Sequence, residues 1–217
     1  MKVVRITPTD SASLDAFAQV MVDAFATEDI HSYIFDFARG GTRQTLVRAA
    51  RVELESYAGV RDHVLVAVMG GRVVGGAMVS RNARRPVRRR MFQGLRWLLA
   101  AVPLAPAVRW RRLRRLHTAT GLSRPVVGEH YTLAALTVHP DFQGRGIGSA
   151  LLDEVHRLSE LDPGVIGVYL YTGARKNQLM YERKGYQTIE ARQTEALTVY
   201  HMFRTNGGSF VTVDSSD

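Results

Sequence analysis

Hydrophobic and polar residues follow regular patterns along the chain, and the first of these patterns predict strands. Residues 2–6 alternate and are rich in β-branched side chains, which is typical of an edge or half-buried strand. Residues 64–69 and 72–79 repeat this pattern on either side of Gly70-Gly71. Two strand patterns separated by two glycines predict an antiparallel hairpin, because glycine accepts the positive φ angles of a tight turn.

Helical spacing separates the first strand from this hairpin. Apolar residues recur at intervals of three and four over residues 14–25 and again over 42–57, which predicts two amphipathic helices. Polar residues at 9–13 could cap the first helix, and Gly40-Gly41 interrupts the pattern between the two. The first half therefore combines strands and helices.

The second half repeats this alternation around one central stretch. Residues 133–138 are a short apolar run that predicts a strand, and Pro140 ends it by removing an amide donor. Apolar spacing from Ile147 predicts a helix directly afterwards. The remaining predicted elements are a strand at 164–171, a helix at 176–184 ended by Gly185, and a closing hairpin over 186–192 and 196–204. The predicted fold class is mixed α/β.

A glycine-rich loop joins the central strand to its helix. Its sequence is Gln-Gly-Arg-Gly-Ile-Gly over residues 143–148. A strand, a glycine loop and a helix N-terminus together leave several amides without intrahelical partners, which suits a phosphate or pyrophosphate. The loop matches neither the P-loop pattern nor the dinucleotide-binding pattern, and glycine-rich turns of this kind are often purely structural.

Two blocks of residues carry a more specific resemblance. Gln143, Gly146 and Gly148 follow a strand ending in Val-x-Pro, and this pattern resembles the acyl-CoA loop of the GCN5-related N-acetyltransferase (GNAT) superfamily. The segment from Asn177 to Tyr186 resembles the following helix of that family, in which an Asn and a Tyr face the cofactor. The two blocks stand at the separation that the family shows.

The resemblance implies a fold, a co-substrate and a reaction. It implies a central, mostly antiparallel twisted sheet of about seven strands flanked by helices, within a single domain over residues 1–204. It implies acetyl-CoA as co-substrate and transfer of its acetyl group, by direct attack in a ternary complex, to a primary amine of a small molecule. The cofactor-binding residues that it implies are Leu136, Thr137, Val138, Gln143, Gly144, Arg145, Gly146, Ile147, Gly148, Ser149 and Asn177.

The same resemblance suggests catalytic groups. Tyr181 takes the family position of the general acid, where a phenol can donate a proton to the leaving thiolate. The family often supplies a base just before the central strand, which makes Glu129 and His130 the candidate bases. Aromatic residues around the end of the first helices, among them Phe25, are candidates for the wall of the acceptor site or for the core.

Composition singles out one insertion. Residues 81–128 contain 13 arginines and neither lysine nor any acidic residue, so the rest of the chain carries 29 − 13 = 16 basic against 20 acidic residues. Prolines at 103 and 106 predict two helices with a break between them. In puromycin acetyltransferase-like relatives extra helices at this place cover the acceptor pocket.

This insertion also leaves alternatives open. The acceptor could be a protein or peptide amine, or the insertion could dock the protein on a membrane surface through residues 81–115, or on nucleic acid. Nucleic acid is not the expected partner, because an ordinary helix pair on the domain gives the same pattern.

The rest of the composition narrows the setting. The chain has no cysteine and no apolar run long enough to span a membrane, and its seven histidines have no ligand-like spacing. We therefore expect a cytoplasmic protein without a metal or a transmembrane segment, either a monomer or a homodimer. Residues 205–217 are small and polar and predict a loose tail.

Overall fold

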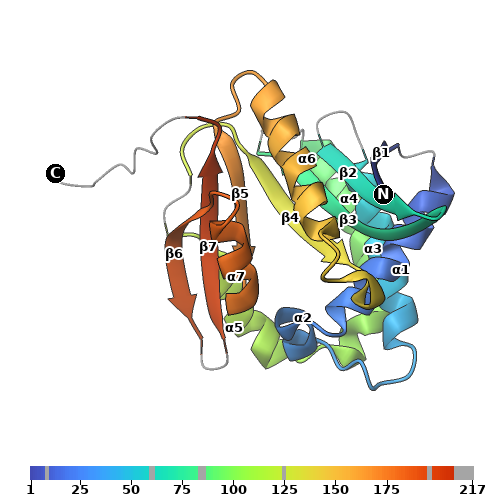
Figure 1. Cartoon of the computed structure of the whole chain (residues 1–217). Coiled ribbons are helices and arrows are strands. Elements are labelled where there is room, and N and C mark those ends of the chain that lie inside the picture. The colour runs from blue at the N-terminus through green and yellow to red at the C-terminus, as the bar shows by residue number, and fades with distance from the viewer. Residues whose placement is uncertain (8–9, 59–61, 83–86, 124–125, 195–196, 208–217) are drawn as a thin grey trace.

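The structure is a computed structural model that describes residues 1–7, 10–58, 62–82, 87–123, 126–194 and 197–207 (Figure 1). The predictions made for residues 83–86 of the insertion and 208–217 of the tail lie outside the described residues. The strands are β1 (Lys2–Ile6), β2 (Asp62–Met69), β3 (Arg72–Arg81), β4 (Tyr131–Val138), β5 (Gly167–Thr172), β6 (Gln187–Gln193) and β7 (Thr198–Thr205). The helices are α1 (Ser11–Phe25), α2 (Asp29–Ile34), α3 (Thr42–Tyr57), α4 (Val87–Ala101), α5 (Trp110–Thr120), α6 (Ile147–Leu161) and α7 (Arg175–Glu182), with 3₁₀ turns η1 (Val102–Ala107) and η2 (Pro140–Phe142).

The strands form one seven-stranded sheet in the order β1-β2-β3-β4-β5-β7-β6. Every neighbouring pair is antiparallel except β4 and β5, which are parallel. The mixed α/β fold class, with a mostly antiparallel sheet flanked by helices, is therefore confirmed. The predicted hairpins are present as β2–β3 and β6–β7, and β7 rather than β6 pairs with β5.

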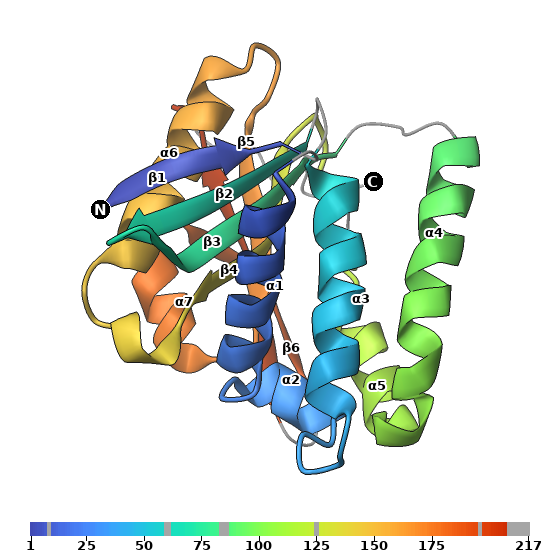
Figure 2. The ribbon, with the colours of Figure 1, turned by 90° about the vertical axis from the view of Figure 1, so that its right-hand side faces the viewer.

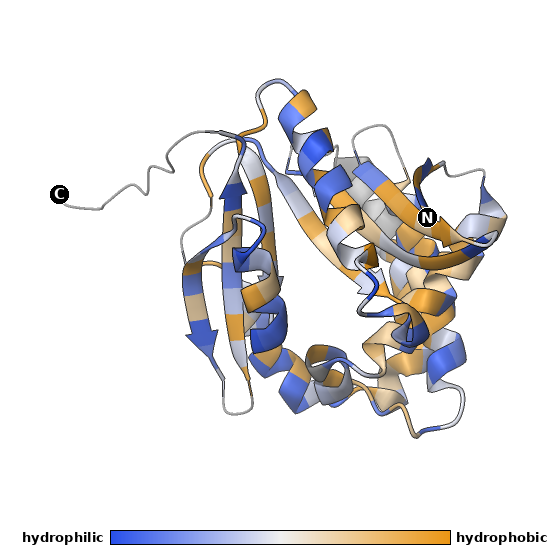
Figure 3. Ribbon diagram, viewed as in Figure 1, coloured by the Kyte–Doolittle hydropathy of each residue, from blue (hydrophilic) through white to orange (hydrophobic). Residues whose placement is uncertain are grey.

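Helices cover both faces of the sheet. Figure 2 shows α1, α3 and α4 side by side on one face, with α6 and α7 on the other. Leu14 and Phe17 of α1 are fully buried against β2 and β3, whereas Leu151 and Leu152 of α6 are fully buried on the opposite side. Apolar residues are concentrated in β2, β3 and α1, and hydrophilic residues lie on the outward side of α6 (Figure 3). The helical spacing read from the sequence thus marks the faces that build the core.

The insertion folds as two helices with a break at its prolines. α4 runs to Ala101, η1 contains Pro103 and Pro106, and α5 begins at Trp110. This arrangement confirms the two predicted helices. α4 packs on α3, and the end of α5 is tied to the sheet by a hydrogen bond between His201 Nε2 and the Ala119 carbonyl at 2.9 Å.

The central strand separates from its parallel neighbour. β4 and β5 pair only through Tyr131 with Val168 and Thr132 with Tyr169, at the beginning of each strand. The register of β4 with β3 then skips Ala134, which is a β-bulge. Beyond this point β4 and β5 diverge, as Figure 1 shows, and the edge of β4 that faces β5 has no strand to pair with.

Two buried histidines make the stability of this fold dependent on pH. His63 of β2 is buried with its Nε2 3.2 Å from the Tyr131 hydroxyl, and His156 of α6 has its Nε2 3.2 Å from the Tyr186 hydroxyl. Burial is the main cause that lowers the pKa of each imidazole to about 4, because a charged ring is poorly solvated there. The folded state therefore takes up these two protons only in strong acid.

We predict a loss of stability between pH 6.5 and 4. In this window the unfolded chain, with ordinary histidines, binds protons that the folded chain does not, so each histidine should destabilise the fold by about 2 kcal/mol at pH 5 relative to pH 7.5. Replacing His156→Gln should reduce this acid loss by about that amount, measured by urea unfolding at both pH values. Tyr186→Phe is the control: it removes the hydroxyl but keeps the burial, so the acid loss should persist. An unchanged acid loss in the His156 variant would contradict the prediction.

Candidate active site

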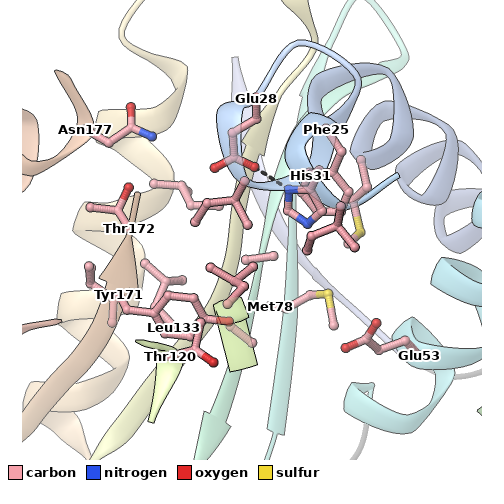
Figure 4. A pocket seen from close by; sticks show the side chains of 18 of the residues that line it. Phe25, Glu28, His31, Glu53, Met78, Thr120, Leu133, Tyr171, Thr172 and Asn177 are labelled. Carbon is pink, nitrogen blue, oxygen red and sulfur yellow. Dashed lines mark hydrogen bonds and ion pairs between the residues drawn. The ribbon is translucent and has the colours of Figure 1, made fainter. Parts of the chain in front are cut away.

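A cavity of about 350 Å³ lies where β4 and β5 separate. Residues from the middle of β4, the end of β5, α7, α1, α2, α3 and α5 line it, so that both faces of the open sheet edge and the insertion contribute. Its lining residues include Met21, Phe25, Glu28, His31, Glu53, Met78, Leu113, Leu116, Leu133, Ala134, Ala135, Leu136, Tyr171, Thr172, Asn177 and Tyr181. Apolar and polar side chains share this wall, and several of the polar groups converge from opposite sides (Figure 4).

The edge of β4 offers backbone groups to this side. The His139 amide donates to the Val74 carbonyl of β3 at 2.9 Å, and Thr137 is in register with Gly76. Backbone groups of successive strand residues point in opposite directions, so those of Leu136 and Val138 face the gap toward β5. Of the three strand residues predicted to bind cofactor, Leu136 and Val138 are thus directed to the gap. The Thr137 backbone turns toward β3 instead, and its side chain is buried.

The glycine loop leads into α6 as the sequence predicted. Gly144 and Gly146 have φ angles of 74° and 76°, in the left-handed region that favours glycine. The first intrahelical bond is donated by the Ala150 amide to the Gly146 carbonyl, at 3.0 Å, and no side chain caps the helix. The amides of Ile147, Gly148 and Ser149 consequently precede the first helical hydrogen bond, which is the arrangement that binds phosphate groups at helix N-termini.

Two side chains of the loop brace it. Gln143 Nε2 donates to the Val138 carbonyl at 3.2 Å and so ties the loop to the end of β4. Arg145 donates to the Asp141 carbonyl at 3.2 Å, and its guanidinium lies 5.1 Å from the Phe142 ring centroid. Arg145 is exposed and keeps further donors for a ligand. The cofactor roles predicted for these residues stay predictions, and the contacts add a structural role.

α7 places two predicted residues at the cavity. Asn177 and Tyr181 are one turn apart, and both line the wall opposite α2. Burial, and secondarily the Glu28 carboxylate, raise the pKa of the Tyr181 phenol well above its usual value, so the phenol is protonated at neutral pH. Its ring packs edge-on against Tyr186, with centroids 5.5 Å apart. The hydroxyl makes no hydrogen bond to the described part of the chain.

Acidic groups on the opposite wall were not anticipated. The Nδ1 atom of His31 lies 2.6 Å from Oε2 of Glu28. A carboxylate can only accept, so Nδ1 carries the proton and donates. Phe25 stacks on the imidazole with ring centroids 3.7 Å apart, which fixes its plane. Figure 4 shows the Glu28–His31 pair and the Glu53 carboxylate directed into the same cavity.

Glu53 is the most strongly desolvated carboxylate of this wall. Burial raises its pKa, and the nearby His31 opposes this only partly. Glu28 and Glu53 also contribute to the raised pKa of the Tyr171 phenol, after burial. These effects place two carboxylates close enough to share one electrostatic environment with Tyr171. Such a group of perturbed titratable residues in a cavity is typical of an active site.

Helix α5 closes the cavity from the insertion side. Leu113, Leu116, His117 and Thr120 contribute to its wall. Two arginines fasten α5 to α2. Arg109, just before α5, donates to the Ser32 carbonyl at 2.7 Å, and Arg112 donates to the Tyr33 carbonyl at 3.3 Å. Part of the unusual arginine content of this segment is thereby explained as helix-to-backbone bracing.

The two residues predicted to supply the base are elsewhere. Glu129 forms an ion pair with Arg81 and is partly exposed at the closed end of the β4–β5 pair. His130 is buried, with Nδ1 2.9 Å from the Gly128 carbonyl, and its ring packs edge-on against Tyr169 and Phe203. Burial lowers the pKa of His130. Both residues lie at the start of the paired part of β4 and β5 and are not among the residues that line the cavity, so their role as the base stays a prediction.

The sequence contains only weak indications that Glu28, His31 and Glu53 belong to a site. Glu28 and His31 are three residues apart at the start of a six-residue helix, where acidic and polar residues are ordinary caps. Glu53 belongs to a helix with charged residues on its exposed face. The aromatic cluster was the better indication, because Phe25, a candidate for the acceptor wall, does line the cavity.

The described residues contain no group of three or more histidine, cysteine or acidic side chains placed to hold a metal ion. Among them there is also no helix with the length and hydrophobicity needed to cross a bilayer.

Comparisons with known proteins agree with this architecture. Residues 114–188 match the acetyltransferase (GNAT) domain family, from the second half of α5 to the start of β6. The structure described as histone acetyltransferase HPA2 and related acetyltransferase from Corynebacterium glutamicum superposes with a TM-score of 0.64 at 20% identity, covering 97% of this chain and 98% of that one. An aminoglycoside 6'-N-acetyltransferase complexed with coenzyme A gives 0.59 at 11% identity, covering 97% and 100%.

The similar structures also include an enzyme with a protein substrate. The ribosomal-protein-S18-alanine N-acetyltransferase from Escherichia coli gives a TM-score of 0.52 at 14% identity, covering 100% of this chain and 99% of that one. A comparison with curated protein sequences found no match. At these identities the solved structures establish the fold, and the domain match covers the glycine loop and α7. Residues 114–188 therefore match the acetyltransferase (GNAT) domain, and the chain as a whole shares the fold of the solved acetyltransferases.

Proposed function

We propose that this enzyme transfers the acetyl group of acetyl-CoA to the primary amine of a small molecule, by direct attack in a ternary complex. The proposal rests on one cavity that two groups of residues share. The open edge of β4 and Tyr181 contribute to it, and so do the side chains of Glu28, His31 and Glu53. One wall thus provides acyl-donor elements, and the other provides groups that attract and deprotonate an amine.

The chain's own residues fit acetyl-CoA. The amides that open α6 suit its pyrophosphate, and Arg145 adds positive charge beside them. The backbone groups of Leu136 and Val138 can pair with the pantetheine arm as a strand would, in the place where β5 has diverged. When bound, acetyl-CoA supplies an activated thioester carbonyl. A strand amide at this edge, that of Val138 in our proposal, then donates to the carbonyl oxygen as its negative charge grows.

The Glu28–His31 pair replaces Glu129 and His130 as the proposed base. An amine arrives as an ammonium ion and must lose a proton before it can act as a nucleophile. Glu28 is held by the Nδ1 donor of His31, and stacking on Phe25 holds the ring itself. The pair can therefore accept the proton directly or through one water molecule. Glu53 adds a second negative group that attracts the ammonium ion.

Tyr181 serves as the proposed general acid. Its phenol is protonated because its pKa is raised, and its hydroxyl is not committed to another described residue. It can donate a hydrogen bond or proton to the sulfur as the thiolate leaves. Asn177, one turn earlier on the same face of α7, is proposed to contact the cofactor arm.

The closure of the cavity favours a small acceptor. α5 contributes Leu113 and Leu116 to the wall, and Met21 and Ile34 add further apolar surface. This lining suits an amine with a compact apolar body. Aminoglycoside and ribosomal-protein acetyltransferases both occur among the similar structures, so the fold alone favours neither class. We further infer a single domain over 1–204, a cytoplasmic location, no metal, and a monomeric or dimeric state, all from the sequence.

The base is tested by Glu28→Gln, which keeps the size of the side chain but removes its charge. We expect kcat with acetyl-CoA and a reactive amine to fall by about 10²–10⁴-fold, with the KM for acetyl-CoA nearly unchanged. Glu129→Gln is the matched control, because it removes a carboxylate that pairs with Arg81 outside the cavity, and it should retain kcat. The opposite pattern, activity lost in the Glu129 variant and kept in the Glu28 variant, would reverse this assignment.

The acid is tested by Tyr181→Phe. The ring remains to pack against Tyr186, so folding and acetyl-CoA affinity should be preserved while kcat falls by about 10²–10⁴-fold. Free-thiol release across a panel of amines measures the rate, and calorimetry measures the affinity. Tyr186→Phe, which removes a buried hydroxyl beside His156, serves as a control and should leave kcat within about threefold. An unaffected kcat in Tyr181→Phe would remove this residue from the mechanism.

The cofactor site is tested by Ser149→Glu, which places a carboxylate in the first turn of α6. An acidic side chain there stabilises the helix by about 0.3–1 kcal/mol but repels the pyrophosphate, so thermal stability should hold or rise while the Kd for acetyl-CoA increases at least tenfold. Ser11→Glu at the start of α1 makes the same change at another helix N-terminus. It should leave the acetyl-CoA Kd unchanged. Undiminished affinity in Ser149→Glu would show that the α6 amides do not hold the cofactor.

A further inference from the structure

Helix α4 exposes a row of large apolar side chains to the outside of the molecule. These are Leu95, Leu98 and Leu99 of α4, followed by Val102, the first residue of η1. They are spaced by three and four, as residues on one side of a helix are, and each is more than half exposed, Leu99 by 66%. No described residue covers them. We call these four residues the outer stripe.

The exposed leucines of α4 are unusual, because a helix on the surface of a monomeric protein normally turns its large apolar side chains toward the core. The side of the helix that packs toward α3 and α1 carries Ala100 and Ala101, which contact the cluster formed by Val22, Leu46 and Ala49. Within residues 94–101, whose side chains the structure describes, the helix thus turns small side chains inward and exposes its leucines. Contiguous apolar surface of this kind marks an interaction site, whereas single exposed leucines do not.

Arginines precede and follow the outer stripe along the chain. The sequence places three consecutive arginines, 88–90, in the first turn of α4, and Arg111 and Arg114 are exposed on α5. Neither of these two α5 arginines has an ion-pair partner among the described residues. In contrast, Arg96 is neutralised by Glu55 at 2.6 Å. Trp110, 60% exposed, stands at the start of α5 with its indole N–H bonded to the Ala105 carbonyl of η1.

We propose that the outer stripe of α4 docks the enzyme on the surface of an anionic membrane. An apolar helical face flanked by arginine and tryptophan is the pattern of a helix that lies in the bilayer interface, with leucines among the acyl chains and guanidinium groups at the lipid phosphates. The stripe is far too short to cross the bilayer, which agrees with a peripheral contact. This inference is independent of the proposed substrate and of the catalytic residues.

The charge of this surface favours an anionic membrane over a second copy of the chain, and its apolar side chains favour a membrane over nucleic acid. In a symmetric dimer the outer stripe of one copy would pack on the outer stripe of the other. The two arginine-rich segments, residues 81–128 of each copy, would then also face each other, and neither contains an acidic residue. That contact is repulsive. Nucleic acid would satisfy the arginines, but it offers nothing to four aliphatic side chains in a row. Anionic lipid satisfies both parts of the surface.

Vesicle co-sedimentation of the full chain tests the proposal, with phosphatidylcholine vesicles and with vesicles containing about 30% phosphatidylglycerol. We expect binding to the anionic vesicles, weakened at least tenfold at high salt, and little binding to the neutral ones. Leu99→Asp should weaken binding at least tenfold. Leu161→Asp is the matched control, because Leu161 at the end of α6 is equally exposed, at 66%, and this variant should bind as wild type does.

A second variant keeps the test decisive should Leu99→Asp fold poorly. Arg111→Gln combined with Arg114→Gln should reduce binding to anionic vesicles and lessen its salt dependence, while circular dichroism and free-thiol release remain those of the wild type. Absence of wild-type binding to anionic vesicles overturns the proposal, as does an equal loss in Leu161→Asp. Light scattering that shows a dimer dissociated by Leu99→Asp overturns it in favour of a second copy, and tighter binding to duplex DNA than to vesicles overturns it in favour of nucleic acid.

Discussion

The short pairing of β4 with β5 is the constraint on which the rest of this structure depends. Parallel strands can pair along their whole length, but here only Tyr131 and Thr132 find partners before the bulge at Ala134. An unpaired strand edge inside a domain is costly unless another group satisfies its backbone. The open edge of β4 therefore offers donors and acceptors that a strand-like ligand can use, and the divergence of β4 from β5 creates the cavity beside it. Chemistry and sheet topology are coupled at this one point.

Local features of this protein were predictable from sequence, and long-range ones were not. The helix over residues 42–57 and the hairpin across Gly70-Gly71 were predicted because their signals, apolar spacing and turn glycines, lie within the elements themselves. The α6 loop and the position of Tyr181 followed from two motifs that fold as local units. The distance of Glu129 from the cavity could not be predicted, because it lies 143 − 129 = 14 residues before Gln143 and only the pairing pattern reveals that β4 begins at the closed end. Glu28, just before α2, and Glu53 of α3 line the same cavity although they are far apart in the sequence, which no local pattern records.

The insertion combines two roles that its arginine content obscures. Arg109 and Arg112 bind backbone carbonyls of and just after α2, so these charges fix α5 over the cavity rather than meet a partner. Arg96 pairs with Glu55 and holds α4 on α3. Arg111 and Arg114 are exposed and have no ion-pair partner among the described residues. The basic character of the chain thus divides into a structural part, which shapes the acceptor wall, and a surface part, which accompanies the outer stripe.

In contrast to the basic insertion, the cavity contains carboxylates, those of Glu28 and Glu53, and these have two opposing effects on an amine substrate. Two carboxylates attract an ammonium ion, yet the same attraction stabilises the charged amine and opposes its deprotonation. Burial counteracts this, because it raises the pKa of Glu53 above its usual range and so brings a carboxylate closer to an amine in proton affinity. The hydrogen bond from His31 holds Glu28 in one orientation. In our proposal Glu53 attracts the cation from a desolvated position, and the Glu28–His31 pair, held in place by its hydrogen bond, accepts the proton, whereas two fully solvated carboxylates would only attract the cation.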